Sequence, residues 1–431
     1  MESLFCFFLK TPTYMKRIII TAIAAILALG TVDAKPKQLK AWQEGYMDIH
    51  HISTGLGSAI FFMLPDGTRL LADAGDLGDP SRWKHKEIMP AVPSADKRPA
   101  EWIARYIEHF SKPLNRELYL DYAMITHFDT DHYGIMDHTA ITVAGKPYKY
   151  TGMTHLANLV PIRTMIDRGY PAYDYPTPER FRKRNGKLFK NYELFIKERE
   201  SLGLKNEQFR VGSDKQFVLK TAAEKYPTFR IMNIAANGKI WTGKGENTRN
   251  LVPASAPKDA ALNENSSSCV FRLEYGNFSY YLGGDISGTW SRKKKNPWND
   301  VQSQVAKVIG TVDVAVADHH GYRDSVNENL LKALNTNVLV IPIWDLYHPH
   351  PNAMKRVVEQ GVPEIFPAGI TEARLAEMKE KGLGDNIRKD GHIVVRVYKG
   401  GKKYQVFVLN DRSLDYEVIY KSRTFKSRGN K

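Results

Sequence analysis

The sequence predicts a layered α/β protein, and three observations support this. Short apolar runs with strand character alternate with stretches of helical pattern along most of the chain. Several strand-like runs end directly in clusters of Asp and His, as in folds whose strand ends form a site. The 431 residues are 42% hydrophobic and 25% charged, a composition that excludes a disordered or fibrous chain.

Residues 1–34 are expected to be a signal peptide. Two basic residues precede the apolar run from Ile18 to Leu29, and small residues end the segment at Ala34. The run is too short to span a bilayer comfortably, although a retained anchor is the alternative. Residues 1–14 could be an upstream mis-start. We therefore expect an exported protein, periplasmic or extracellular, with no integral membrane domain after cleavage.

The net charge of +15 indicates an acidic partner, such as nucleic acid or another anionic ester. Removal of residues 1–34 would leave +14, so the basic character belongs to the rest of the chain. Cys6 would leave with the signal peptide. Cys269 would then be alone and without a disulfide partner, so we expect it to be a small buried strand residue.

The expected elements follow one another in a recognisable order after residue 59. The first is a hairpin whose turn is Pro65-Asp66-Gly67, since Pro presets φ and Gly accepts a positive φ. A less regular middle segment, 140–262, contains a basic helical stretch at 178–205. The other expected elements are helices at 101–110, 301–309 and 326–335, strands at 118–126, 312–321 and 337–343, and hairpins within 268–285 and 392–409.

The string MITHFDTDHYG carries the strongest chemical signal. It places His127, Asp129, Asp131 and His132 directly after a buried-looking strand. An extended segment turning into a loop can aim these four side chains at one point. Imidazoles and carboxylates are the usual ligands of divalent cations. The pattern therefore predicts a metal site, with a solvated acidic turn as the alternative.

Two later strands end in the same kind of residue. Asp285 follows YYLGG, and Asp318, His319 and His320 follow VAVA. Asp285 by itself would also suit a helix N-cap, and the histidine pair by itself is equally consistent with a structural role. Three strand ends that carry Asp and His together favour a shared site.

These strings resemble the metallo-β-lactamase-fold hydrolases, in particular their competence-protein (ComEC-like) branch in a soluble exported form. The resemblance covers roughly 46–400, except most of 140–262, and rests on GLGSAIFFMLPDGTRLLADAG, THFDTDHYG, NSSSCVFRLEYGNFSYYLGGD, DHHGYRDS and LYHPHP in that order. It implies an α/β fold of the four-layer αββα metallo-β-lactamase sandwich type. The domain would span 41–415 with an insertion at 140–262, followed by a basic C-terminal tail at 416–431.

The resemblance also implies two divalent metal ions, zinc or manganese. His127 and Asp129 would bind one ion and Asp131 and His132 the second, with Asp285 between them. The pair His319 and His320 would supply a further ligand, with His320 preferred. Asp73 would support the loop 127–132, here called the metal loop, from behind it, and a turn aspartate is the alternative for that residue.

Two departures from the family pattern matter. Asp129 stands where histidine is commonest, and the histidine usually found before the strand leading to Asp285 is absent from 263–267. The first ion's site is therefore rich in oxygen and a ligand short, which weakens the case for zinc over manganese.

The expected reaction is hydrolysis of a phosphodiester by hydroxide held between the two metals. Asp131 would orient this hydroxide, with His320 or His350 near the developing negative charge. Arg180, Arg182 and Lys183 are candidates for substrate binding, and the alternative is a solvated charged face. The alternatives are hydrolysis of small or cell-wall esters, lactones or β-lactams, and a metal-deficient binding module on the same fold.

Overall fold

The computed structural model describes residues 37–83, 88–256, 262–288 and 297–429. Residues 39–431 form a single compact unit. The expected signal peptide lies outside the described residues. Within the described part of the chain, no helix is both long and apolar enough to cross a membrane.

The first sheet has nine strands, and its first half is antiparallel. The order β17-β16-β15-β1-β2-β3-β4-β5-β6 is antiparallel from β17 to β3 and parallel from β3 to β6. The strands are β1 (Met47–His51), β2 (Ile60–Met63), β3 (Arg69–Ala72), β4 (Leu120–Met124), β5 (Ile162–Asp167), β6 (Lys205–Gln208), β15 (His392–Val397), β16 (Lys403–Leu409) and β17 (Val418–Lys426).

The second sheet has eight strands in the order β14-β13-β12-β11-β10-β7-β8-β9. Here β11 to β14 run parallel, and the remaining neighbours pair antiparallel. The strands are β7 (Arg230–Ala236), β8 (Lys239–Trp241), β9 (Thr248–Asn250), β10 (Val270–Tyr275), β11 (Phe278–Leu282), β12 (Val314–Val316), β13 (Val338–Pro342) and β14 (Glu364–Ala368).

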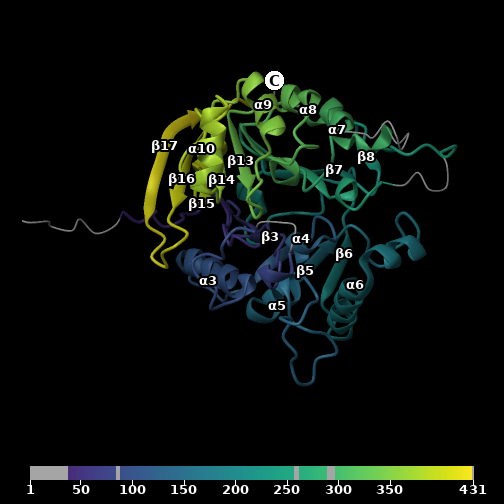
Figure 1. Cartoon of the computed structure of the whole chain (residues 1–431). Helices are drawn as coiled ribbons and strands as arrows, with labels where there is room; N and C mark the ends of the chain where they lie inside the picture. Colours follow the sequence, from purple (N-terminus) through teal and green to yellow (C-terminus); the bar gives the residue numbers. More distant parts are fainter. Residues whose placement is uncertain (1–36, 84–87, 257–261, 289–296, 430–431) are drawn as a thin grey trace, which may run out of the picture. The chain divides into compact units, whose positions relative to one another are not determined.

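The helices form two outer layers, one on each sheet (Figure 1). The first layer comprises α3 (Pro99–Ser111), α5 (Gly152–Leu159) and α6 (Pro178–Ser201), and α4 (Thr130–Tyr133) lies in the metal loop. The second layer comprises α7 (Val301–Ile309), α8 (Glu328–Leu334), α9 (Pro351–Glu359) and α10 (Glu372–Glu380).

Three apolar cores lie between these four layers. The central core joins the inner faces of the two sheets through residues such as Phe62, Phe271 and Val406. One outer core packs α3, α5 and α6 on the first sheet, and the other packs α7 to α10 on the second. Alternation along each strand sends side chains to one core or the other. The predicted αββα sandwich is thereby confirmed.

The middle segment contributes to both sheets. Within 140–262, β5 and β6 extend the parallel half of the first sheet, and β7, β8 and β9 extend the second. The segment 416–431, expected as a basic tail, supplies β17 at the edge of the first sheet, paired with β16. Cys269 is fully buried just before β10, as expected from its type.

Candidate metal centre

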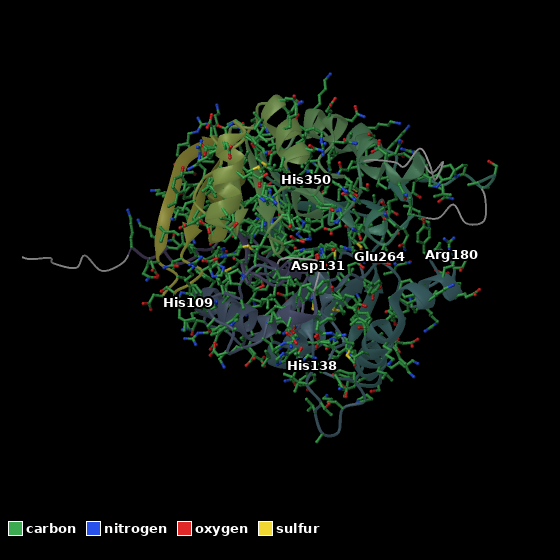
Figure 2. All side chains as sticks on the ribbon, in the orientation of Figure 1. His109, Asp131, His138, Arg180, Glu264 and His350 are labelled. Atoms are coloured by element: carbon green, nitrogen blue, oxygen red, sulfur yellow. The ribbon has the colours of Figure 1, made fainter. Side chains whose placement is uncertain are left out.

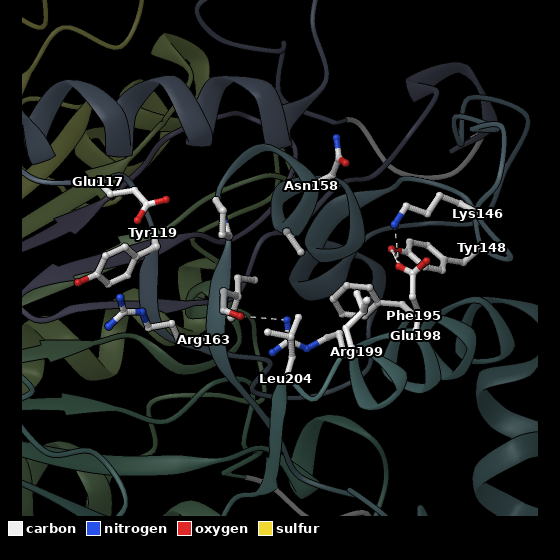
Figure 3. A pocket seen from close by; sticks show the side chains of 14 residues that line it. Glu117, Tyr119, Lys146, Tyr148, Asn158, Arg163, Phe195, Glu198, Arg199 and Leu204 are labelled. Carbon is white, nitrogen blue, oxygen red and sulfur yellow. Dashed lines mark hydrogen bonds and ion pairs between the residues drawn. The ribbon is translucent and has the colours of Figure 1, made fainter.

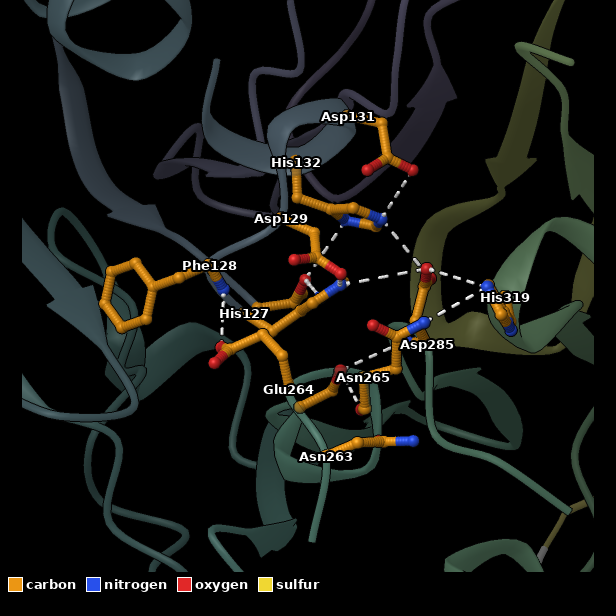
Figure 4. A network of polar contacts seen from close by, with 12 residues as sticks. His127, Phe128, Asp129, Asp131, His132, Asn263, Glu264, Asn265, Asp285 and His319 are labelled. Carbon is orange, nitrogen blue, oxygen red and sulfur yellow. Dashed lines mark hydrogen bonds and ion pairs between the residues drawn. The ribbon is translucent and has the colours of Figure 1, made fainter. Parts of the chain in front are cut away.

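The carboxyl ends of parallel strands from both sheets meet at one place. Asp73 follows β3, the metal loop follows β4, Asp285 follows β11, and His319 and His320 follow β12. In open α/β sheets, ligands bind outside the carboxyl ends of the strands. The side chains that the sequence singled out at 127–132, 285 and 319–320 lie together there (Figure 4).

The backbone of the metal loop is held by the loops of the first hairpin. The N–H of Ser58 donates to the carbonyl of Asp131 at 2.8 Å, and the N–H of Ala74 donates to the carbonyl of His132 at 2.8 Å. A Cβ on Gly75 would come within 2.0 Å of the Asp131 carbonyl oxygen. Glycine is therefore required at position 75, because no side chain fits in this contact.

One group of four donors surrounds a single point. Asp131, His132, Asp285 and His320 are all buried, and one ligand atom from each lies within 4.8 Å of the others. Asp131 Oδ2 is 2.9 Å from His320 Nε2, and Asp285 Oδ1 is 3.3 Å from His132 Nε2. Two carboxylates and two imidazole nitrogens facing one another form a donor set that suits a divalent cation.

The second donor group shares Asp285 with the first, whose His320 Nε2 lies 3.4 Å from Asp285 Oδ2. His127 Nε2 is 3.8 Å from Asp129 Oδ2 and 3.8 Å from Asp285 Oδ2, and His319 Nε2 is 4.0 Å from the same Asp285 oxygen. These separations are too long for hydrogen bonds. Among the described residues, the buried His127 Nε2 has no hydrogen-bond partner. A cation between these atoms would satisfy it.

Asp73 orients His132 from behind. Its Oδ2 accepts from His132 Nδ1 at 2.7 Å and from the Thr126 hydroxyl at 2.8 Å, and its Oδ1 accepts from the Thr126 N–H. A carboxylate on Nδ1 fixes the ring and leaves Nε2 facing the donor group. Asp73 therefore lies behind His132, and its supporting role stays a prediction.

The two consecutive histidines diverge. His319 and His320 both have left-handed backbone conformations, with φ of 46° and 54°. His320 Nδ1 lies 3.2 Å from the Pro342 carbonyl, and its Nε2 faces Asp131. His319 Nδ1 pairs with Asp324 at 2.8 Å, and its Nε2 faces Asp285. The strained turn thus gives one imidazole to each donor group.

The electrostatics differ between the groups. Burial, reinforced by His132, lowers the pKa of His127 to about 3, so this imidazole is neutral. Burial opposes protonation of His320, but Asp285 and Asp131 outweigh it and raise the pKa of His320 to about 9. In the absence of a metal ion, a proton on His320 therefore balances part of the carboxylate charge.

Glu264 and Arg168 form a buried ion pair that sequence reasoning missed. Glu264 Oε2 lies 2.6 Å from Arg168 Nη2, and Glu264 Oε1 accepts from the Phe128 N–H at 2.9 Å. Burial raises the pKa of the Glu264 carboxyl, but Arg168 outweighs this and keeps it below its ordinary value. The pair ties the loop before β10 to the metal loop.

The string LYHPHP places His348, not His350, beside the centre. His348 stacks on His320, with ring centroids 5.2 Å apart and planes 13° apart, and it is buried. His350 is the N-cap of α9, and its Nδ1 accepts from the Asn352 N–H. The catalytic role expected for His350 therefore has no contact with the donor groups to support it among the described residues.

The basic residues of α6 lie apart from the centre. Figure 2 shows Arg180 at the flank of the unit, away from Asp131. Arg182 pairs with Glu193 at 3.1 Å, and Lys183 is exposed. The aromatic residues between them, such as Phe181 and Phe189, are buried in the outer core. These rings are core residues.

A separate pocket of about 330 Å³ lies between β5, α5 and α6 (Figure 3). Glu198 accepts from Lys146 at 2.9 Å and from the Tyr148 hydroxyl at 2.7 Å, and Arg199 donates to backbone and side-chain oxygens. The pocket contains none of the predicted site residues, and within it Lys146 and Glu198 pair with each other.

The fold and the donor groups define an αββα sandwich with an Asp/His centre at its strand ends. No family model matches the chain. It is 29% identical over 141 residues to Recombination protein 2 of Haemophilus influenzae, a match that covers 32% of this chain and 16% of that protein.

Three solved structures show weak overall similarity. A protein of Parabacteroides distasonis assigned as a metal-dependent hydrolase has a TM-score of 0.32 and 11% identity, covering 82% of this chain and 97% of that one. Unliganded yeast PDE1 has a TM-score of 0.36 and 12% identity, covering 82% and 99%. A diphosphatase of the PhnP family has a TM-score of 0.30 and 9% identity, covering 81% and 97%.

Proposed function

We propose that the protein is an exported metal-dependent hydrolase that cleaves phosphodiester bonds. The observation that carries this proposal is the pair of donor groups that share Asp285, made of carboxylates and imidazoles from both sheets. They would bind two divalent ions, zinc or manganese. The proposed ligands are His127, Asp129, Asp285 and His319 for one ion, and Asp131, His132, Asp285 and His320 for the other.

Two such ions lower the pKa of a bound water and stabilise negative charge on the attacked group. The residues of the chain would position the reactants. Asp131 Oδ2, already 2.9 Å from His320 Nε2, would accept a hydrogen bond from the attacking water and orient it. Asp73 would keep His132 in place, and the Pro342 carbonyl would keep His320 in place.

The proposed substrate is an anionic ester, and nucleic acid is the leading member of that class. The net charge of +15 and the exposed basic residues of α6 support this choice. Arg180, Arg182 and Lys183 would contact the phosphate backbone outside the centre. Polynucleotide binding should then weaken steeply with salt, whereas binding of a small ester should not.

The test is hydrolysis by the metal-stripped protein after addition of manganese or zinc. The substrates are single-stranded DNA, bis-p-nitrophenyl phosphate, a phosphorylcholine ester and a β-lactam. Asp131→Ala should lower the rate about 100-fold to 10,000-fold with an unchanged circular dichroism spectrum. The exposed Asp174→Ala is the control and should keep the full rate. Failure to cleave any phosphodiester would refute the proposal.

A further inference from the structure

Asn265 lies within 263–267, the segment where the resembled family usually has a histidine. The sequence has no histidine in 263–267, just before β10, and for that reason the ion site expected for His127 and Asp129, the second donor group, is one ligand short. In the structure this segment ends in a short 3-10 helix, Asn265–Ser267, beside the centre. Its first residue carries an amide, which can present either an oxygen or a nitrogen.

The side chain of Asn265 points at the second donor group. Its amide Nδ2 lies 3.1 Å from His319 Nε2, the ring nitrogen that faces Asp285. Figure 4 shows the amide turned toward His319 and Asp285. Asn265 therefore contacts the second donor group from the short helix before β10.

The protonation of His319 Nε2 determines which atom of the Asn265 amide can face it. His319 Nδ1 lies 2.8 Å from Asp324, so a neutral His319 carries its proton on Nδ1 and presents a lone pair on Nε2. Without a cation, the Asn265 NH₂ donates to that lone pair. A half-turn of the amide places Oδ1 there instead, and two lone pairs 3.1 Å apart would repel unless a cation lay between them.

The spacing suits a shared ion. Adjacent ligands about 2.1 Å from one octahedral ion lie about 3 Å apart. The main chain of this turn is bonded without the amide, because the Ser268 hydroxyl donates to the Asn265 main-chain carbonyl at 2.7 Å.

We infer that Asn265 Oδ1 is a ligand of the ion that His127 and Asp129 would bind, and that it shifts the relative affinity of this site from zinc toward manganese. The inference rests on the proposed two-ion hydrolase. An amide oxygen in place of an imidazole makes the donor set richer in oxygen. Oxygen ligands suit manganese, whereas zinc binds more tightly when imidazole nitrogen is present.

The experiment measures metal binding to the full chain after chelator treatment, without reference to activity. Bound manganese and zinc are counted by elemental analysis and titrated by calorimetry. Electron paramagnetic resonance separates coupled manganese pairs from isolated ions. The variants are Asn265→Leu, Asn265→Asp and Asn265→His, and Asn263→Asp is the control because it adds the same charge two residues away.

Asn265→Leu should lose one of two manganese ions, with an affinity loss of roughly 100-fold at that site, and should show the spectrum of an isolated ion. Asn265→Asp should bind at least as tightly as the wild type. Asn265→His should keep two ions and raise the zinc-to-manganese affinity ratio about tenfold. Asn263→Asp should match the wild type.

Either of two results would overturn this inference while leaving the hydrolase proposal in place. Asn265→Leu could keep two ions with affinities within twofold of the wild type, or Asn265→Asp could weaken binding as much as leucine does. The second result would show that Asn265 only donates to His319, since an ionised carboxylate cannot donate. If Asn265→Leu fails to fold, the direction of the Asn265→Asp effect decides. A wild type that binds no ion would refute the hydrolase proposal as well.

Discussion

Asp73 contributes to the centre without facing the point where the donors meet. It holds a positive φ of 65°, which places its carboxylate against His132 Nδ1 at 2.7 Å. Asparagine tolerates the same backbone conformation and has the same shape. Asp73→Asn therefore removes the charge on the acceptor while leaving the backbone undisturbed.

We predict that Asp73→Asn weakens metal binding about 10-fold to 100-fold, because the carboxylate fixes the ring and raises its basicity. Calorimetric titration of the metal-stripped protein measures the effect, and the exposed Asp174→Asn serves as the control. Unchanged affinity would show that Thr126 and the surrounding packing hold His132 without help from Asp73.

At the scale of elements, the Arg168–Glu264 pair joins β5, the loop before β10 and the metal loop. Both side chains are buried, at 1% and 7% exposure. Removing one partner of a buried pair leaves an uncompensated charge. We predict that Glu264→Gln lowers the free energy of unfolding by about 3–5 kcal/mol in urea denaturation.

The double variant Arg168→Met with Glu264→Leu should recover most of the loss caused by Glu264→Gln, because it removes both charges together. A loss below about 1 kcal/mol for Glu264→Gln would contradict the assigned role. Such a result would mean that water reaches Arg168 in the native protein.

The same elements show what the sequence could predict. The strands around 60–72 and 118–126 and the donors from His127 to His132 follow from local patterns, since spacing along one strand end determines their placement. Glu264 has no such signal. A lone carboxylate among Asn and Ser looks like a surface loop, and only its contact with Arg168, 96 positions away, makes it buried.

The sequence also could not predict that His319 and His320 face different donor groups, because this depends on two consecutive positive φ values. The strands within 140–262 could not be predicted from the sequence for a related reason. Its strands β5 to β9 are short and pair with strands distant in the chain, so local alternation is weak where tertiary pairing decides.

At the scale of the whole molecule, stability depends on histidines that fold in the neutral form. His51 lies buried against Tyr280, with ring centroids 6.0 Å apart, and within the described residues neither ring nitrogen has a hydrogen-bond partner. Burial, with a smaller effect of His50, lowers the pKa of His51 to about 3. Burial and His50 likewise lower the pKa of His392 to about 3.

Because these folded-state values lie below the unfolded value of about 6.5, the unfolded chain binds more protons between pH 3 and pH 6.5. Stability is thus complete above that window and is lost as the pH falls through it. Each such histidine lowers the free energy of unfolding by about 2 kcal/mol when the pH falls from 7 to 5. His51→Leu should reduce the pH dependence of the unfolding free energy by that amount, measured by urea denaturation at both pH values with chelator present.

His138→Leu, at an exposed position, is the control and should leave the wild-type dependence in place. An equal dependence in His51→Leu and the wild type would show that His51 is protonated or hydrated in the folded protein.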